Sequence, residues 1–325
     1  MNSSPLNTSF LRSQVCPTCG SDRSVPCVSS QPPAENLDFA SLKQGWYGFF
    51  RKKVFFTYHR CARCGQLYSP SYFTDDALAE LYGSMPDNTA GMRDTYLERT
   101  QQGYYSFLKR HCAMRGDYFE LGPDVGMLTQ FIAAEPGIGK MWLYEPNRVV
   151  GPILAEKVKA KAFEIRTEMK DFSAVPNGSL GVCVMVHVLD HLPDVAAVMR
   201  VIARKLRPDG YLLIVTHDER SLLARILRER WPAYCLQHPL LFNKRSTAKF
   251  LSTCGLEVVE TRKSTNYFPA TYLLKHLLFA LGLGRVAQWN SWACVIPLKL
   301  GNIMTVARPQ KDAGAGVGAA ENISS

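Results

Sequence analysis

From Asp117 to Ala307 the chain alternates short apolar segments with segments in which apolar residues recur at helical spacing. The apolar segments predict strands, at 117–121, 141–144, 180–186, 211–216, 256–261 and 303–307. The segments between them predict helices, at 127–134, 147–159, 194–206 and 247–254. This alternation is typical of a mostly parallel sheet covered by helices on both faces. The sequence therefore predicts an α/β fold for this part of the chain.

A glycine-containing turn, residues 119–126 (FELGPDVG), follows the first of these strands. Gly122 and Gly126 can adopt left-handed backbone and let a ligand approach the main chain closely. The next strand ends at a second acidic residue, Glu145, where a carboxylate can accept both hydroxyls of a ribose. We therefore expect a nucleotide-type cofactor, with Glu120 and the two glycines at one end of it and Glu145 at its ribose.

Two Cys-x-x-Cys pairs, Cys16/Cys19 and Cys61/Cys64, precede this domain, and a glycine follows each pair. Two intervening residues let one turn present both sulfurs to one ion, and four thiolates complete the tetrahedral coordination of Zn²⁺. The apolar segments 53–60 and 66–68 flank the second pair. This predicts the strand, turn and strand of a zinc ribbon, with a structural rather than catalytic metal.

These patterns divide the 325 residues into four parts. We expect a zinc ribbon over 1–75, a helical connector over 76–116, the α/β domain over 117–308 and a disordered tail over 309–325. The N-terminus lacks the apolar core of a signal peptide, so the ten cysteines favour metal ligands in a reducing cytoplasm over a disulfide framework. The apolar stretch 272–283 is too short for a membrane span, and we expect a packed helix or a pocket lid.

The net charge is +10, which favours anionic partners such as nucleotides, nucleotide-linked sugars, nucleic acid or a membrane surface. No acidic residue lies between Asp38 and Asp75. Six basic residues do: Lys43, Arg51, Lys52, Lys53, Arg60 and Arg63. Two interpretations stay open. The charges can balance a four-thiolate zinc site, or they can form a phosphate- or nucleic-acid-binding face.

Further motifs follow the glycine turn in a fixed order. Lys170-Asp171-Phe172 comes first, then 180–194 (LGVCVMVHVLDHLPD) and 204–212 (RKLRPDGYL). Together with the turn and Glu145, they resemble class I S-adenosylmethionine-dependent methyltransferases. The resemblance implies a Rossmann-like, seven-stranded, mainly parallel sheet. It also implies S-adenosylmethionine as cofactor, adenine contacts from Asp171 and Phe172, and a place for His187 in the wall of the cofactor pocket.

The N-terminal cysteine pairs narrow this resemblance. A cysteine clip ahead of such a domain is similar to bacterial methyltransferases of sugars and small metabolites, some of them C-methyltransferases of nucleotide-linked deoxysugars. Their "EHxxxFS" segment, which carries a base, corresponds to 237–243 (QHPLLFN) here. The cofactor brings its own activated methyl group, so the protein must orient the acceptor and remove its proton. The resemblance implies His238 as that base, with Gln237 in place of the usual acid.

Asp124 departs from the family pattern, because it stands where the middle glycine of the turn is expected. It would place a carboxylate near the carboxylate of the cofactor, which predicts weaker binding or a non-catalytic relative. His191 follows His187 by four residues, as paired metal ligands on a helix do. The strand ends near His187, however, so we expect no shared helix face, and we expect Asp190 and His191 to order the loop.

The sequence is therefore compatible with three functions. The first is methyl transfer to a small anionic acceptor such as a sugar or nucleotide-linked sugar. The second is an RNA methyltransferase that grips its substrate with the basic ribbon. The third is a non-catalytic binding protein, which Asp124 would mark. The turn lacks the closely spaced glycines of a nicotinamide dehydrogenase. The aromatic segment Tyr267, Phe268 and Tyr272 is open to two interpretations, an acceptor-site wall or core packing.

Overall fold

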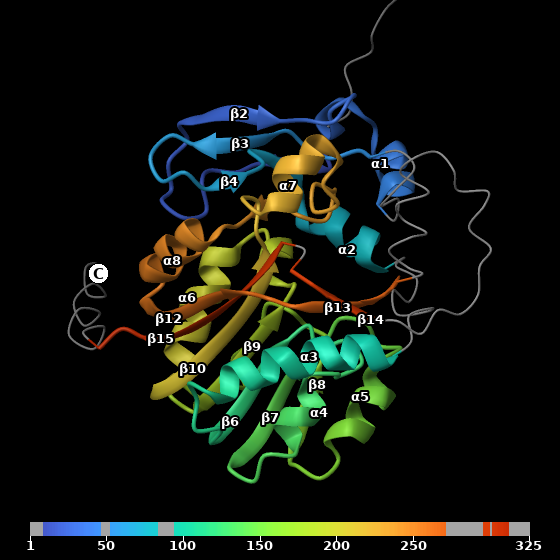
Figure 1. Ribbon diagram of the computed structural model, residues 1–325. Coiled ribbons are helices and arrows are strands. Elements are labelled where there is room, and N and C mark those ends of the chain that lie inside the picture. Colours follow the sequence, from blue (N-terminus) through green and yellow to red (C-terminus); the bar gives the residue numbers. More distant parts are fainter. Residues whose placement is uncertain (1–8, 47–52, 84–93, 271–294, 300, 312–325) are drawn as a thin grey trace, which may run out of the picture.

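A central sheet organises the computed structural model, which describes residues 9–46, 53–83, 94–270, 295–299 and 301–311. The sheet has seven strands in the order β12-β15-β10-β9-β6-β7-β8 (Figure 1). They are β6 Gly116–Leu121, β7 Ile138–Tyr144, β8 Phe163–Arg166, β9 Leu180–Val186, β10 Leu206–His217, β12 Leu256–Lys263 and β15 Asn302–Pro309. The strands from β6 to β10 pair in parallel, and β15 pairs antiparallel with both β10 and β12. The expected seven-stranded, mainly parallel sheet is confirmed.

Helices cover both faces of the sheet, as the alternation predicts. They are α3 Asp94–Lys109, α4 Thr129–Ala133 and α5 Gly151–Val158 on one face, with α6 Val195–Lys205 and α8 Lys244–Thr253 on the other. Successive side chains of β9 point to opposite faces. Cys183 and Met185 pack into the core beneath α6 and α8, whereas Val182 and Val184 pack beneath α3, α4 and α5. This central strand is therefore apolar throughout because both of its faces are buried.

Several element boundaries differ from the sequence prediction, and two of them, at α5 and β10, lie in the α/β part. The helix expected from residue 147 begins at Gly151, because the side chain of Asn147 accepts the N–H of Val149 in a turn. The strand expected from residue 211 begins at Leu206. The predicted turn at 208–210 lies within β10, as an irregularity in its pairing with β9.

The N-terminal part forms its own sheet, in the order β11-β4-β3-β2. Its strands are β2 Ser24–Val28, β3 Tyr58–Cys61, β4 Leu67–Tyr68 and β11 Leu240–Leu241. The strand predicted over 53–60 begins only at Tyr58, because the backbone before it bonds to loops. The N–H of Phe55 donates to the Ser30 hydroxyl, and that of Thr57 donates to Glu35.

Smaller elements complete the described chain. They are β1 Leu11–Ser13, β5 Ser71–Phe73, β13 Asn266–Pro269, β14 Val295–Leu298, α1 Phe39–Gly45, α2 Asp75–Gly83 and α7 Leu222–Leu227. Three single-turn helices, η1 Ala34–Asn36, η2 Leu189–His191 and η3 Arg228–Arg230, are also present. Among these residues no helix has the length and apolar character needed to cross a bilayer. Arg51, Lys52, the apolar stretch 272–283 and the tail from 312 lie outside the described residues.

The N-terminal part lies against the edge of the central sheet at which β9 and β10 end (Figure 1). β11, which belongs in sequence to the α/β part, pairs with β4 of the N-terminal sheet. Two tyrosines strengthen this junction: the Tyr58 hydroxyl donates to the His238 carbonyl at 2.6 Å, and the Tyr72 hydroxyl to the Leu236 carbonyl at 3.0 Å. The loop that carries His238 is therefore held by the N-terminal part.

Candidate active site and cysteine cluster

The glycine turn follows β6 and has the backbone that its sequence predicts. Gly122 and Gly126 both have φ of 71°, and Asp124 has φ of 52°. A Cβ on Gly122 would lie 2.6 Å from a methyl carbon of Val188, so a larger residue is excluded on steric grounds as well. The turn is fixed to the next strand, because the N–H of Gly122 donates to the carbonyl of Tyr144 at 2.8 Å.

Glu120 lies at the end of β6 and is almost completely buried, with 2% of its surface exposed. One carboxylate oxygen accepts the hydroxyls of Tyr118 at 2.5 Å and Thr129 at 2.6 Å. Burial raises the pKa of Glu120 to about 7, although the two hydroxyl donors act in the opposite direction. The carboxyl group is thus poised between its charged and neutral forms near neutral pH.

Glu145 connects the glycine turn to the loop after β7. Its two carboxylate oxygens accept the N–H groups of Asp124 and Asn147, each at 2.8 Å. Burial raises the pKa of Glu145, and the two backbone donors oppose that shift. Each carboxylate oxygen can accept more than one hydrogen bond, so both keep acceptor capacity for a ligand.

Asp171 and Phe172 follow the loop beyond β8 and differ in exposure. Asp171 is exposed, and its carboxylate accepts the N–H of Ser173 at 2.9 Å. Phe172 is buried and packs edge-to-face against Tyr144 and Phe119, at ring-centroid distances of 4.9 and 5.5 Å. Phe172 therefore anchors this loop to the same two strands that carry Glu120 and Glu145.

Four histidines surround a buried carboxylate where β9 and β10 end. This histidine cluster consists of His187, Asp190, His191, His217 and His238. Asp190 is fully buried, and its Oδ2 lies 2.5 Å from Nδ1 of His217. His187 follows β9 with a left-handed φ of 53°, and its Nε2 lies 3.3 Å from the amide nitrogen of Asn302. A left-handed backbone in a residue other than glycine is a strained conformation that is common at functional sites.

His238 meets His191 within this cluster. Their Nε2 atoms are 3.1 Å apart, and the two rings lie edge-to-face. Nδ1 of His238 lies 2.7 Å from the Ala233 carbonyl, while the Gln237 amide donates to the Trp46 carbonyl at 3.1 Å. Gln237 therefore contacts the N-terminal part and does not orient the imidazole of His238.

The electrostatics differ among the members of the histidine cluster. Burial, with the neighbouring rings, lowers the pKa of His187 and of His191 to about 3. For His238 burial also lowers the pKa, but Cys235, Asp190 and the Ala233 carbonyl outweigh it and raise the pKa to about 9. Burial acts to raise the pKa of Asp190, but His217 and the other histidines hold it well below its usual range. Near neutral pH the cluster thus combines the charged carboxylate of Asp190 with neutral imidazoles at His187 and His191 and a charged imidazole at His238.

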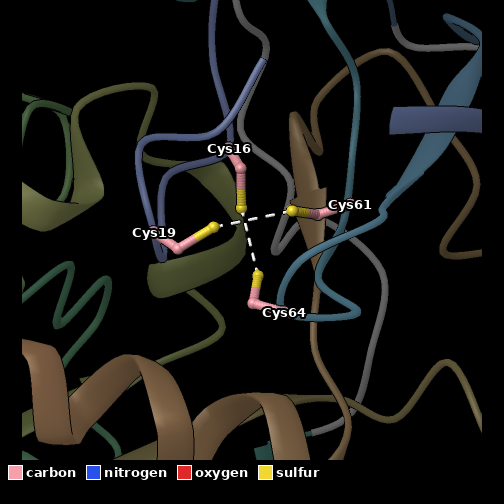
Figure 2. Close-up of side chains that lie close together, drawn as sticks. All are labelled: Cys16, Cys19, Cys61 and Cys64. Atoms are coloured by element: carbon pink, nitrogen blue, oxygen red, sulfur yellow. Dashed lines mark hydrogen bonds between the residues drawn. The ribbon is translucent and has the colours of Figure 1, made fainter. Parts of the chain in front are cut away.

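The four predicted cysteines converge in the N-terminal part (Figure 2). The sulfurs of Cys16 and Cys64 are 3.3 Å apart, and those of Cys19 and Cys61 are 3.5 Å apart. Zn–S bonds of about 2.3 Å in a tetrahedron place sulfurs about 3.8 Å apart, so a small outward movement would accommodate the ion. The donor set and its spacing therefore fit Zn²⁺.

Both cysteine turns have the same backbone. Gly20 and Gly65 have φ of 68° and 78°, a left-handed backbone that glycine adopts without steric cost. Each glycine N–H donates to the carbonyl of the first cysteine of its pair, at 2.8 and 2.9 Å. Cys27 is exposed, and its sulfur contacts the Val25 carbonyl.

Three of the six basic residues in the acid-free stretch, Lys43, Lys53 and Arg60, contact other parts of the protein, whereas Arg63 is exposed. Lys43 pairs with Glu80 at 2.7 Å, and the Lys53 ammonium donates to the Trp231 carbonyl. Arg60 reaches both oxygens of Glu219 at 3.2 Å. These charges join the N-terminal part to its own helix and to the loops after β10.

The structure brings Glu120, Gly122, Gly126 and Glu145 to the ends of the adjacent strands β6 and β7. It places His187, Asp190, His191 and His238 in one cluster. Sequence reasoning missed His217 and treated the histidines one by one. The sequence feature that could have pointed to His217 is its position at the end of β10, the strand next to β9. Tyr267 lies against the guanidinium of Arg99, with the ring centroid at 4.5 Å. Tyr272 lies outside the described residues.

Comparison with known proteins identifies the central part of the chain. A family model described as a methyltransferase domain matches residues 94–261, just over half of the chain. No curated protein matches significantly.

Among solved structures the chain is similar to an S-adenosylmethionine-dependent methyltransferase of Thermotoga maritima, with 14% identity, a TM-score of 0.44 and coverage of 67% of this chain and 91% of the other. It is also similar to a candidate S-adenosylmethionine-dependent methyltransferase of Listeria monocytogenes, with 11% identity, a TM-score of 0.46 and coverage of 65% and 99%. A third is the mitomycin 7-O-methyltransferase, with 19% identity, a TM-score of 0.44 and coverage of 73% and 58%.

Proposed function

The chain belongs to the methyltransferase domain family, and we propose that it methylates a small anionic acceptor of the sugar or nucleotide-linked sugar class. The methyl donor that the family implies is S-adenosylmethionine. The acceptor proposal is supported by the loop with His238, whose sequence resembles the base-bearing segment of sugar methyltransferases. This loop is buried between the N-terminal part and the ends of β9 and β10.

The proposed cofactor site lies along the ends of β6 and β7. Gly122 and Gly126 would let the methionine end approach the backbone, and Glu120 supplies a carboxyl group beneath it. Glu145 would accept the ribose hydroxyls with its remaining lone pairs, because its backbone donors already fix its orientation. The cofactor would supply the activated methyl group. The residues named here would orient the cofactor and form hydrogen bonds with its polar groups.

The adenine would lie beside the loop after β8. Asp171 is proposed to contact the exocyclic amino group through its exposed carboxylate. Phe172 is proposed to contact the ring through the small part of its surface that does not pack against Tyr144 and Phe119. His187 would close the pocket at the end of β9, since its strained backbone directs it into the histidine cluster.

His238 is proposed as the group that activates the acceptor. Its Nδ1 faces a carbonyl, which can only accept. In the neutral form, which a pKa of about 9 places above neutral pH, the ring therefore carries its proton on Nδ1 and has a lone pair on Nε2. That lone pair can take a proton from the acceptor as a general base. The expected His238→Asn phenotype is loss of turnover with cofactor binding retained.

We also propose that the N-terminal part is a zinc ribbon with a supporting role. Four thiolates leave no open coordination position, so the ion would brace the fold. The braced part in turn holds the His238 loop through the hydroxyls of Tyr58 and Tyr72. We expect zinc in the cysteine cluster by elemental analysis, with one equivalent per chain lost in Cys64→Ser. A Cys64→Ser protein that keeps its zinc would contradict this assignment.

A methyl-transfer assay tests the acceptor class. Radiolabelled S-adenosylmethionine is incubated with nucleotide-linked sugars, free sugars and RNA, and the labelled product is separated. The proposal predicts label in a sugar-containing product. Label in RNA alone would contradict it, and the internal pairing of Lys43, Lys53 and Arg60 argues against that outcome.

A further inference from the structure

The two facing imidazoles of the histidine cluster share an unusual contact. Nε2 of His191 and Nε2 of His238 point at each other over 3.1 Å. Two such nitrogens meet either through one hydrogen bond or as neighbouring ligands of one ion. Metal–nitrogen bonds of about 2.0–2.1 Å place two ligands of a tetrahedral ion about 3.3 Å apart, close to the observed separation.

The outer nitrogens of both rings have partners that suit ligand histidines. Nδ1 of His238 lies 2.7 Å from the Ala233 carbonyl, which can only accept, so in the neutral form of the ring Nε2 carries the free lone pair. Nδ1 of His191 lies 3.5 Å from the hydroxyl of Tyr82. Ligand histidines generally donate their other N–H to a carbonyl, carboxylate or water, which fixes the ring and its tautomer.

A carboxylate completes the group. Ligand atoms of Asp190, His191 and His238 all lie within 4.8 Å of one another. Asp190 is fully buried, and its Oδ1 has no hydrogen-bond partner among the residues that the structure describes. A buried carboxylate oxygen without a partner is costly, and a cation would satisfy it.

We propose that Asp190, His191 and His238 bind a divalent transition-metal cation at the end of β9, separate from the cysteine cluster. Two imidazoles and one carboxylate favour Zn²⁺, Fe²⁺, Co²⁺ or Mn²⁺ over Mg²⁺ and Ca²⁺, which prefer oxygen ligands alone. Three protein ligands leave positions open for a substrate oxygen. This cation site is supported by the distance between the two imidazoles and by the buried carboxylate beside them.

Its use in catalysis rests on the proposed function. A cation at this place would polarise an oxygen of the acceptor and lower its pKa. In the metal-loaded enzyme it would replace the base role of His238, because one lone pair cannot bind both a metal and a proton. The acceptor class would then be a molecule with a hydroxyl or similar oxygen that can coordinate the cation.

Equilibrium dialysis of the purified zinc-containing protein against Co²⁺ tests the site. We expect two cations per chain by elemental analysis, zinc and cobalt together. We also expect visible cobalt absorption without a thiolate-to-cobalt charge-transfer band, since Co²⁺ binds more weakly than Zn²⁺ and should not displace it from the cysteines. A folded wild-type protein that holds a single cation would overturn the proposal.

Matched variants locate the cation. His191→Gln and His238→Gln should each lose one cation per chain. His111→Gln should keep both, because His111 pairs with Glu260 outside the cluster. If the cluster variants fail to fold, Tyr82→Phe removes only the hydroxyl beside His191 and should weaken cobalt binding about tenfold. Equal cobalt binding by His238→Gln and the wild type would place the cation elsewhere and refute the assignment.

The same samples separate this inference from the proposed function. Titration with S-adenosylmethionine reports on the cofactor site alone. Cofactor binding with one cation per chain would overturn the second metal and leave methyl transfer standing. Two cations per chain without cofactor binding would support the metal site and contradict the proposed function.

Discussion

Replacing Glu120 by glutamine should change how the stability of the protein depends on pH. Glu120 is 2% exposed and accepts hydrogen bonds from two hydroxyls, and burial raises its pKa to about 7. In the unfolded chain the carboxyl group titrates near its ordinary value of 4.5. Between these values the unfolded chain has lost the proton that the folded chain retains, so stability falls as pH rises.

The size of the effect follows from these two pKa values. One pH unit of separation corresponds to about 1.4 kcal/mol, so the wild-type protein should lose about 2.5 kcal/mol of unfolding free energy through Glu120 between about pH 5 and about pH 8. Glu120→Gln has no such titration. Its stability relative to the wild type should therefore rise by that amount across the range, whatever fixed cost the amide introduces.

Urea denaturation of the cofactor-free proteins at several pH values measures this difference. Tyr118→Phe provides a companion variant, because it removes a hydroxyl that stabilises the charged carboxylate and should extend the loss of stability to higher pH. Parallel pH profiles for the wild type and Glu120→Gln would refute the reasoning.

Three further substitutions test the turn and the junction. Gly122→Ala should lower stability by about 1–2 kcal/mol and weaken cofactor binding, because φ is 71° and the new Cβ would meet Val188; an unchanged melting temperature would contradict this. Asp124→Gly should raise the free energy of unfolding by about 1 kcal/mol, because glycine adopts the left-handed backbone without strain. The change also removes a carboxylate from the turn, so S-adenosylmethionine should bind more tightly in calorimetry; weaker binding would contradict this. Glu219→Gln should cost about 2 kcal/mol by weakening the pair with Arg60, and faster hydrogen exchange in β3 is the expected sign; exchange confined to other regions would count against it.

The parallel sheet could be predicted because its strands are buried on both faces. β9 was predicted with its observed limits, Leu180–Val186, since seven successive residues avoid charge. β8 was not predicted, because Phe163–Arg166 forms an edge strand with half-exposed side chains and two charged residues among four. The start of α8 was placed too late, because the capping box between Asn243 and Ser246 was not recognised.

The candidate sites also differ in how well the sequence predicts them. The cysteine pairs and the glycine turn are local patterns, so the spacing of their residues along the chain predicts their geometry. The structure shows the four sulfurs together and the glycines with positive φ. The histidine cluster is not local. His187 follows β9, His217 is the last residue of β10 and His238 lies in the loop before β11, and only the order of the strands brings them to one edge. The sequence expectation that His191 and Asp190 merely order a loop did not anticipate their contacts with His238 and His217.

Calorimetric titration of the purified protein with S-adenosylmethionine tests the central claim most directly. The account predicts one binding site per chain and at least about a tenfold loss of affinity in Glu145→Ala, since hydrogen bonds to a charged group contribute about 1.5–3 kcal/mol each. Glu156→Ala, an exposed acid on α5, is the matched control and should bind as the wild type does. A folded protein that binds no S-adenosylmethionine, or that binds it equally well without Glu145, would contradict the account.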